Sequence, residues 1–108
     1  MARLIEFNMD RRTGKTTTAI ALVHGFRALG FPALYVAPTR NLADLVVRSG
    51  ALASHWVVVG ARGICLHPAP VYVLDEAALF ERSPEVDPVQ IALRRAETFK
   101  DGAVYAFY

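Results

Sequence analysis

Two short stretches of this sequence carry side chains suited to binding a polyphosphate. The first, Gly14–Thr17, stands where a predicted strand, Leu4–Asn8, turns into a predicted helix. The backbone N–H groups at the start of a helix are unpaired and can hold phosphate oxygens. In such a loop Gly14 lets the backbone approach closely, Lys15 supplies a positive charge, and the Thr16 hydroxyl faces a Mg²⁺ ion. The stretch therefore indicates a site for the phosphates of a nucleotide.

An acidic pair further along the chain supplies what such a site needs besides a phosphate loop. Asp75 and Glu76 follow Val71–Leu74, a hydrophobic run that is typical of a buried strand. A strand-end aspartate can hold the water shell of Mg²⁺, and a glutamate beside it can deprotonate an attacking water. The plainer interpretation is an acidic helix start, with Lys15 as a solvated lysine. The plain interpretation requires that both of these assignments hold at the same time. We therefore favour a nucleotide site in which Thr16 and Asp75 bind a metal ion and Glu76 is the base that deprotonates water.

Three motifs resemble those of the additional-strand P-loop NTPases, specifically the ATPase domains of phage terminase large subunits and the superfamily-two helicases. Arg11–Thr17 is similar to the terminase form of the phosphate loop, which often lacks the first glycine of the usual motif. That glycine is replaced here by Met9. Ala37–Ala43 resembles a helicase motif that contacts the nucleic-acid backbone, and Val73–Ala77 resembles the Walker B segment of both groups.

The resemblance implies a cofactor and a set of site residues. Mg²⁺ with ATP or ADP would bind to the phosphate loop, through Arg12, Thr13, Gly14, Lys15, Thr16 and Thr17. Lys15 and Glu76 would take part in catalysis. Arg11 would join them, because it occupies the position where terminases use an arginine that acts on the γ-phosphate of the same chain.

The resemblance also implies macromolecular partners. Thr39 and Arg40 would contact DNA or RNA, although a plain helix start in solvent fits these two residues equally well. A second copy of the chain or a larger motor partner would complete the site, with Arg94 or Arg95 reaching in as an arginine finger. Near a helix end these two cations have a simpler role, since they complement the helix dipole.

Taken together, the motifs favour a slow, Mg²⁺-dependent ATPase related to viral DNA-packaging or helicase motors. Two departures favour an alternative, a nucleotide-binding or interaction module that mimics such a motor core without hydrolysis. One is Met9 in place of the first glycine of the loop. The other is the end of the chain at Tyr108, which falls inside the strand that the family places between the phosphate-loop strand and the Walker B strand. A small nucleoside kinase shares the loop but is disfavoured, because the chain has no room for a lid.

Apolar strands alternate with amphipathic helices along the whole chain. The predicted strands are Leu4–Asn8, Ala33–Ala37, Trp56–Val59, Val71–Asp75 and Ala103–Tyr108. The predicted helices are Thr16–Leu29, a second between Asn41 as N-cap and Gly50, and a third between Asp87 as N-cap and Gly102. Gly60–Pro70, rich in glycine and proline, is predicted to be a connection. This order is typical of an α/β three-layer sandwich with a mostly parallel sheet of about five strands, and the family resemblance implies a RecA-like core.

Composition narrows the class of protein further. The 108 residues are 54% hydrophobic and 20% charged, which excludes an intrinsically disordered chain and fits a single domain over residues 1–108. The single Cys65 excludes an internal disulfide, and the charge-free stretches are too short to span a membrane. Residues 1–62 carry 8 basic and 3 acidic side chains, a charge of +5, whereas the whole chain has a net charge of +2. This basic half suits partners that carry phosphate groups. We expect a cytoplasmic protein, in the host cytoplasm if a phage or virus encodes it.

Overall fold

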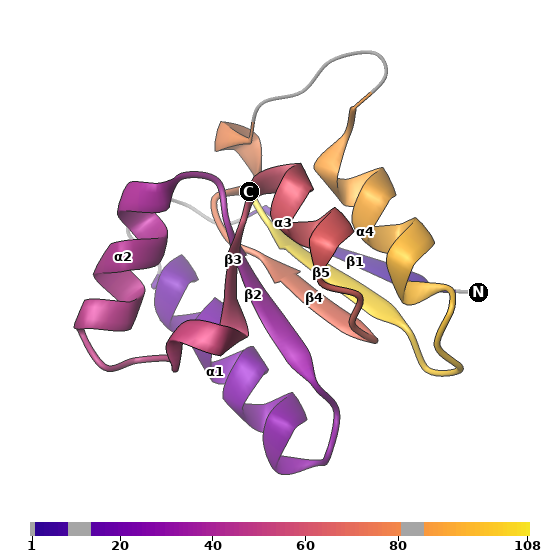
Figure 1. The fold of residues 1–108 in the computed structure, drawn as a ribbon, viewed down its shortest axis with the longest axis horizontal. Helices are drawn as coiled ribbons and strands as arrows, with labels where there is room; N and C mark the ends of the chain where they lie inside the picture. Colours follow the sequence, from indigo (N-terminus) through magenta and orange to yellow (C-terminus); the bar gives the residue numbers. More distant parts are fainter. Residues whose placement is uncertain (1, 9–13, 81–85) are drawn as a thin grey trace.

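Five strands form the middle layer of the protein (Figure 1). The structure is a computed structural model that describes residues 2–8, 14–80 and 86–108. The strands are β1 (Arg3–Phe7), β2 (Ala33–Ala37), β3 (Val57–Val59), β4 (Val71–Leu74) and β5 (Ala103–Phe107). They stand in the order β1-β5-β4-β2-β3, and each neighbouring pair is parallel. This confirms the predicted parallel α/β sheet.

Helices cover both faces of the sheet (Figure 1). They are α1 (Lys15–Ala28), α2 (Arg40–Arg48), α3 (Gly60–Leu66) and α4 (Pro88–Ala96), with short 3₁₀ turns at Ser54–Trp56 and Ala77–Leu79. Val23 of α1 and Ala43 of α2 belong to the hydrophobic cluster on one face. Ile64 of α3 and Ala92 of α4 belong to the cluster on the other face, so the protein is the predicted three-layer sandwich. In the described ranges, no helix is long and apolar enough to cross a membrane.

β2 illustrates why the sheet was recognisable from the sequence. All five of its residues are buried, which is usual for a parallel strand covered on both faces. Leu34 and Val36 point to the α3 and α4 face, whereas Tyr35 points to the α1 and α2 face, because side chains alternate along a strand. Tyr35 thereby carries a hydroxyl group into an otherwise apolar layer.

The order of the strands decides which loops meet. β5 lies between β1 and β4, which confirms the place that the resemblance implies for the last strand. Since parallel strands end at the same edge of a sheet, the segments after β1, β5 and β4 all begin at one side, here called the carboxyl edge. Two strand spacings of about 4.8 Å separate β1 from β4. Long side chains such as lysine and glutamate can bridge that distance.

The prediction of a connection at Gly60–Pro70 is wrong, because most of that segment forms α3. The helix is held by packing: Ile64 is completely buried in the core beside the sheet. Gly63 allows α3 to approach β3 closely, since a Cβ atom at this position would lie 2.9 Å from Cβ of Val58. Tertiary contacts here outweigh the low helix propensity of a glycine-rich segment.

The start of α2 also differs from the prediction. Thr39, and not Asn41, is the N-cap residue, and its Oγ1 accepts a hydrogen bond from the Leu42 N–H at 3.3 Å. The predicted N-cap of α4 is confirmed, because Oδ1 of Asp87 accepts a hydrogen bond from the Val89 N–H at 3.0 Å, but the helix ends at Ala96 and not at Gly102. Both caps satisfy backbone donors that have no partner within their helix.

Candidate functional site

The start of α1 and the turn after β4 meet at the carboxyl edge of the sheet. Lys15 is the first residue of α1, and its Nζ lies 3.1 Å from Oε1 of Glu76. The same ammonium group donates a hydrogen bond to the main-chain oxygen of Tyr108, directly after β5, also at 3.1 Å. Lys15 is only 6% exposed, which is unusual for a lysine and requires partners of this kind. One side chain thus links the ends of three adjacent segments.

Asp75 is the most deeply placed charged residue of this site. It is completely buried, and both of its carboxylate oxygens accept hydrogen bonds. Oδ2 accepts from the Tyr35 hydroxyl at 2.6 Å, and Oδ1 accepts from the N–H of Glu76 at 3.0 Å. Burial, followed by the hydrogen bond to this carboxylate, raises the pKa of Tyr35, so its hydroxyl keeps the proton that it donates. The two bonds hold the Asp75 carboxylate in a fixed orientation.

Glu76 has a backbone conformation that favours glycine. Its φ of 49° and ψ of 49° lie in the left-handed region, and it is the one residue other than glycine with positive φ in the described part of the chain. Such a conformation costs of the order of 1 kcal/mol and is frequent at functional sites. Here it accompanies the turn at which the Glu76 side chain meets Lys15.

The N-terminus of α1 suits an anion. Its N-cap residue is Gly14, which has φ of 72° and no side chain that could cap the first N–H groups of the helix. The main-chain oxygen of Gly14 accepts hydrogen bonds from the N–H and the hydroxyl of Thr18, so the first turn is well formed. No acidic residue lies in this turn. Thr16 is half-buried there and Thr17 is exposed.

The oxygen donors at this edge fit a hard cation such as Mg²⁺. The Thr16 hydroxyl and the Asp75 carboxylate are the donor types that Mg²⁺ prefers. In residues 2–8, 14–80 and 86–108, no group of three or more His, Cys, Asp or Glu side chains could hold a metal by itself. A Mg²⁺ ion at this site would therefore need phosphate oxygens and water to complete its six ligands.

Several residues expected at the site lie elsewhere or outside the described ranges. Arg11, Arg12 and Thr13 fall outside the described residues. Arg94 is exposed on α4, whereas Arg95 donates a hydrogen bond at 2.7 Å to the main-chain oxygen of Cys65 and so ties α4 to α3.

The proposed nucleic-acid contact lies at the start of α2, after β2. The Thr39 hydroxyl is occupied as the helix cap, and Arg40 is exposed beside it. A DNA or RNA contact at these two residues stays a prediction.

Tyr35 is the site residue that the sequence analysis missed. A signal was present, because a tyrosine in the middle of a fully apolar strand must find a partner for its hydroxyl group. The identity of that partner depends on the pairing of β2 with β4, in which Tyr35 lies opposite Val73. That pairing places the Tyr35 hydroxyl close to Asp75, the residue that follows β4.

Comparison with known protein families finds no match for this chain, and comparison with curated proteins finds no similar protein. The functional interpretation therefore depends on the site itself: a buried lysine at a helix start, a buried aspartate and a glutamate between them. All three lie at the edge where parallel α/β sheets generally bind their ligands.

Proposed function

We propose that this protein is a P-loop NTPase that binds Mg·ATP or Mg·ADP at the carboxyl edge and hydrolyses ATP slowly. The observation that carries the proposal is the ion pair between Lys15, at the uncapped start of α1, and Glu76, which follows the buried Asp75. Phosphate loop, metal carboxylate and candidate base would then surround one nucleotide.

Lys15 would change partners when a nucleotide binds. Its ammonium group now faces a carboxylate, and the phosphate oxygens of a nucleotide at the start of α1 would compete for the same charge. Backbone N–H groups and the positive end of the helix dipole add to the attraction of the phosphates. Once Lys15 turns to a phosphate, Glu76 is released from its cation and can accept a proton from water.

Asp75 and Thr16 are the residues that would hold a metal ion. Bound Mg²⁺ supplies charge neutralisation on the phosphates during transfer. Asp75 would take part through the carboxylate that Tyr35 and the Glu76 N–H orient. These donors fix its orientation, but Asp75 is completely buried, so its carboxylate would have to be uncovered for a metal or its bound water to reach it.

Binding without turnover is the second candidate. The same ion pair favours it, because Glu76 cannot act as a base while it is paired with Lys15. An arginine at the transition state is worth about 10³–10⁵ in rate, and Arg11 is the candidate within this chain. We therefore expect turnover well below about 10 s⁻¹, the median for enzymes.

Phosphate release from ATP by wild type and by Glu76→Gln separates the two candidates. Slow, Mg²⁺-dependent turnover that Glu76→Gln abolishes supports the ATPase. Glu97→Gln, at the exposed end of α4, is the matched control and should keep the wild-type rate. Nucleotide binding with no turnover in the wild type would favour the binding module. Turnover that survives Glu76→Gln would remove this residue as the base.

A further inference from the structure

β3 is the edge strand of the sheet on the side opposite β1. Among the described strands, its one hydrogen-bonded neighbour is β2. Proteins protect such edges with charged residues, proline or bulges, since a free edge pairs readily with another chain. β1, at the opposite edge, carries the exposed charges of Arg3 and Glu6. β3 consists of three valines, Val57–Val59, and carries neither a charge nor a proline, so only its short length limits pairing with another chain.

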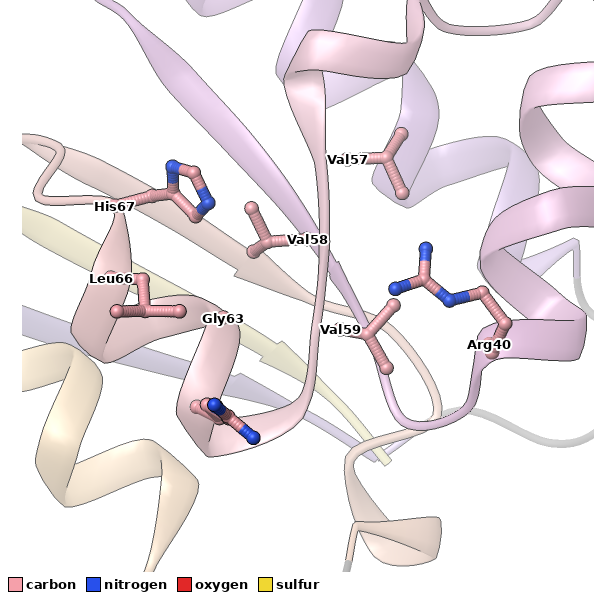
Figure 2. A pocket seen from close by; sticks show the side chains of 8 residues that line it. Arg40, Val57, Val58, Val59, Gly63, Leu66 and His67 are labelled. Carbon is pink, nitrogen blue, oxygen red and sulfur yellow. The ribbon is translucent and has the colours of Figure 1, made fainter.

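A cavity of about 480 Å³ surrounds this free edge, and we call it the β3 groove. Figure 2 shows Val57 and Val59 on the side of Arg40, and Val58 on the side of Gly63 and Leu66. The groove therefore extends around the strand between α2 on one face of the sheet and α3 on the other. An extended chain is the shape that fits such a space.

Positive charges predominate at the groove. Arg40 starts α2 directly after β2, and Arg62 lies in the first turn of α3 directly after β3, so both are near the carboxyl end of β3. Both are exposed, and neither forms an ion pair in the described part of the chain. Arg48 and Asp44 lie further along the α2 side. The groove itself is lined by two arginines and by no acidic residue, which favours carboxylates.

We propose that β3 binds an extended, acidic segment of a partner protein as a sixth strand of the sheet, with carboxylates close to Arg40 and Arg62. Main-chain hydrogen bonds to β3 would supply the general affinity, and the arginines would select acidic segments. Successive side chains of a strand point to opposite faces, so two adjacent carboxylates could reach the arginines on both sides.

Two other occupants fit the groove less well. A nucleic-acid strand would satisfy the arginines, but it has no peptide groups that could pair with the edge of β3. A second copy of this chain would bring another β3 groove with its own arginines, and like charges would then face each other. The unpaired strand edge and the positive charge together favour an acidic peptide.

The test uses the full chain and a fluorescent heptapeptide, Asp-Asp-Val-Thr-Val-Asp-Asp, with blocked termini. Binding is measured by fluorescence anisotropy. Two further peptides carry N-methyl groups on alternate amides, one on each edge of the extended peptide, which leaves all charges in place. We expect the unmodified peptide to bind and one of the two N-methylated peptides to lose at least about ten-fold in affinity, because its blocked edge faces β3.

Charge variants test the role of the arginines. Arg40→Glu and Arg62→Glu should each weaken peptide binding about five-fold, which is typical of partly exposed ion pairs. Arg3→Glu, on the opposite edge of the sheet, is the matched control and should leave the affinity unchanged. Among the amide protons of Val57–Val59, those that point away from β2 should exchange more slowly when the peptide is bound.

Four results would overturn the proposal. One is no peptide binding at about 1 mM. Another is equal affinity of all three peptides, since charge alone would then explain the binding. The third is displacement of the peptide by a single-stranded oligonucleotide whose own binding depends on Arg40 and Arg62. The last is a dimer of the protein alone in which the β3 amides that point away from β2 are already protected from exchange.

Discussion

The ammonium group of Lys15 lies 3.1 Å from Oε1 of Glu76, and this ion pair joins the start of α1 to the turn after β4. Their side chains are 6% and 29% exposed, so salt screens the pair less than it screens pairs at the surface. The pair couples the candidate phosphate-binding residue to the candidate base. A ligand that competes with Glu76 for Lys15 would release the Glu76 carboxylate, and this exchange leads to the first prediction.

Glu76→Gln should bind Mg·ADP more tightly than the wild type. The substitution removes both the competitor for Lys15 and a negative charge close to the phosphates, and we expect a gain of about three-fold in affinity. Isothermal titration with Mg·ADP measures this without interference from hydrolysis. Glu97→Gln should titrate like the wild type. Weaker binding by Glu76→Gln would show that Glu76 supports the nucleotide rather than competing with it.

Tyr35→Phe should destabilise the fold through Asp75. It removes a 2.6 Å hydrogen bond and leaves one oxygen of a completely buried carboxylate without its donor. Such a loss costs about 1–3 kcal/mol of unfolding free energy, measurable by urea denaturation. Tyr105→Phe, in the half-buried middle of β5, is the control and should cost less. Equal losses for the two variants would argue against a special role for the Tyr35–Asp75 bond.

Alkaline pH should lower the stability of the protein. Burial raises the pKa of Tyr35, with the Asp75 hydrogen bond adding to the effect, and burial also raises the pKa of Tyr72. In the unfolded chain both groups titrate near the ordinary tyrosine value of 10.0, so the unfolded state loses its protons first as the pH rises. The stabilisation from these two groups is therefore fully present below pH 10 and declines above it.

Urea denaturation between about pH 9 and pH 11 checks this dependence. The free energy of unfolding of the wild type should fall across this range. In the double variant Tyr35→Phe, Tyr72→Phe the fall should be shallower, because two of the groups responsible are gone. An equally steep fall in the double variant would assign the effect to other residues.

Alanine should have opposite effects at two glycines of the α1 region. Gly14 has φ of 72°, and a Cβ there would meet nothing closer than 4.0 Å, so Gly14→Ala costs about 1 kcal/mol through the backbone alone. Gly25 lies inside α1 with open space around it, so Gly25→Ala should stabilise by about 0.5–1 kcal/mol. Urea denaturation measures both values. A Gly14→Ala variant as stable as Gly25→Ala would contradict the left-handed conformation at the helix start.

The strands and the two acidic positions were predictable because their signals are local. Ala33–Ala37 and Val71–Leu74 are apolar throughout, as strands of a doubly covered parallel sheet must be. α3 was missed because two glycines hide its helical pattern, and its burial against β3 is a long-range contact. The N-cap of α2 was misplaced by two residues, because asparagine is by itself the more favourable N-cap residue, whereas the structure uses Thr39.

The contacts between the candidate site residues could not be predicted from the sequence, although the residues themselves could be. The sequence identified Lys15, Asp75 and Glu76, but the ion pair between the first and the last depends on the order of three strands. The Tyr35 contact depends on the register between β2 and β4. Order and register are set by the packing of the whole chain, so local patterns carry little information about them.

Isothermal titration of the wild type, Lys15→Ala and Lys100→Ala with Mg·ATP tests the central claim most directly. Lys100, exposed before β5, is the other lysine of the chain and serves as the matched control. The account predicts one site in the wild type, a loss of about ten- to a hundred-fold in affinity for Lys15→Ala, and no change for Lys100→Ala. Circular dichroism should verify that Lys15→Ala is folded. Equal affinities for all three proteins, or no binding by the wild type, would contradict a nucleotide site at Lys15.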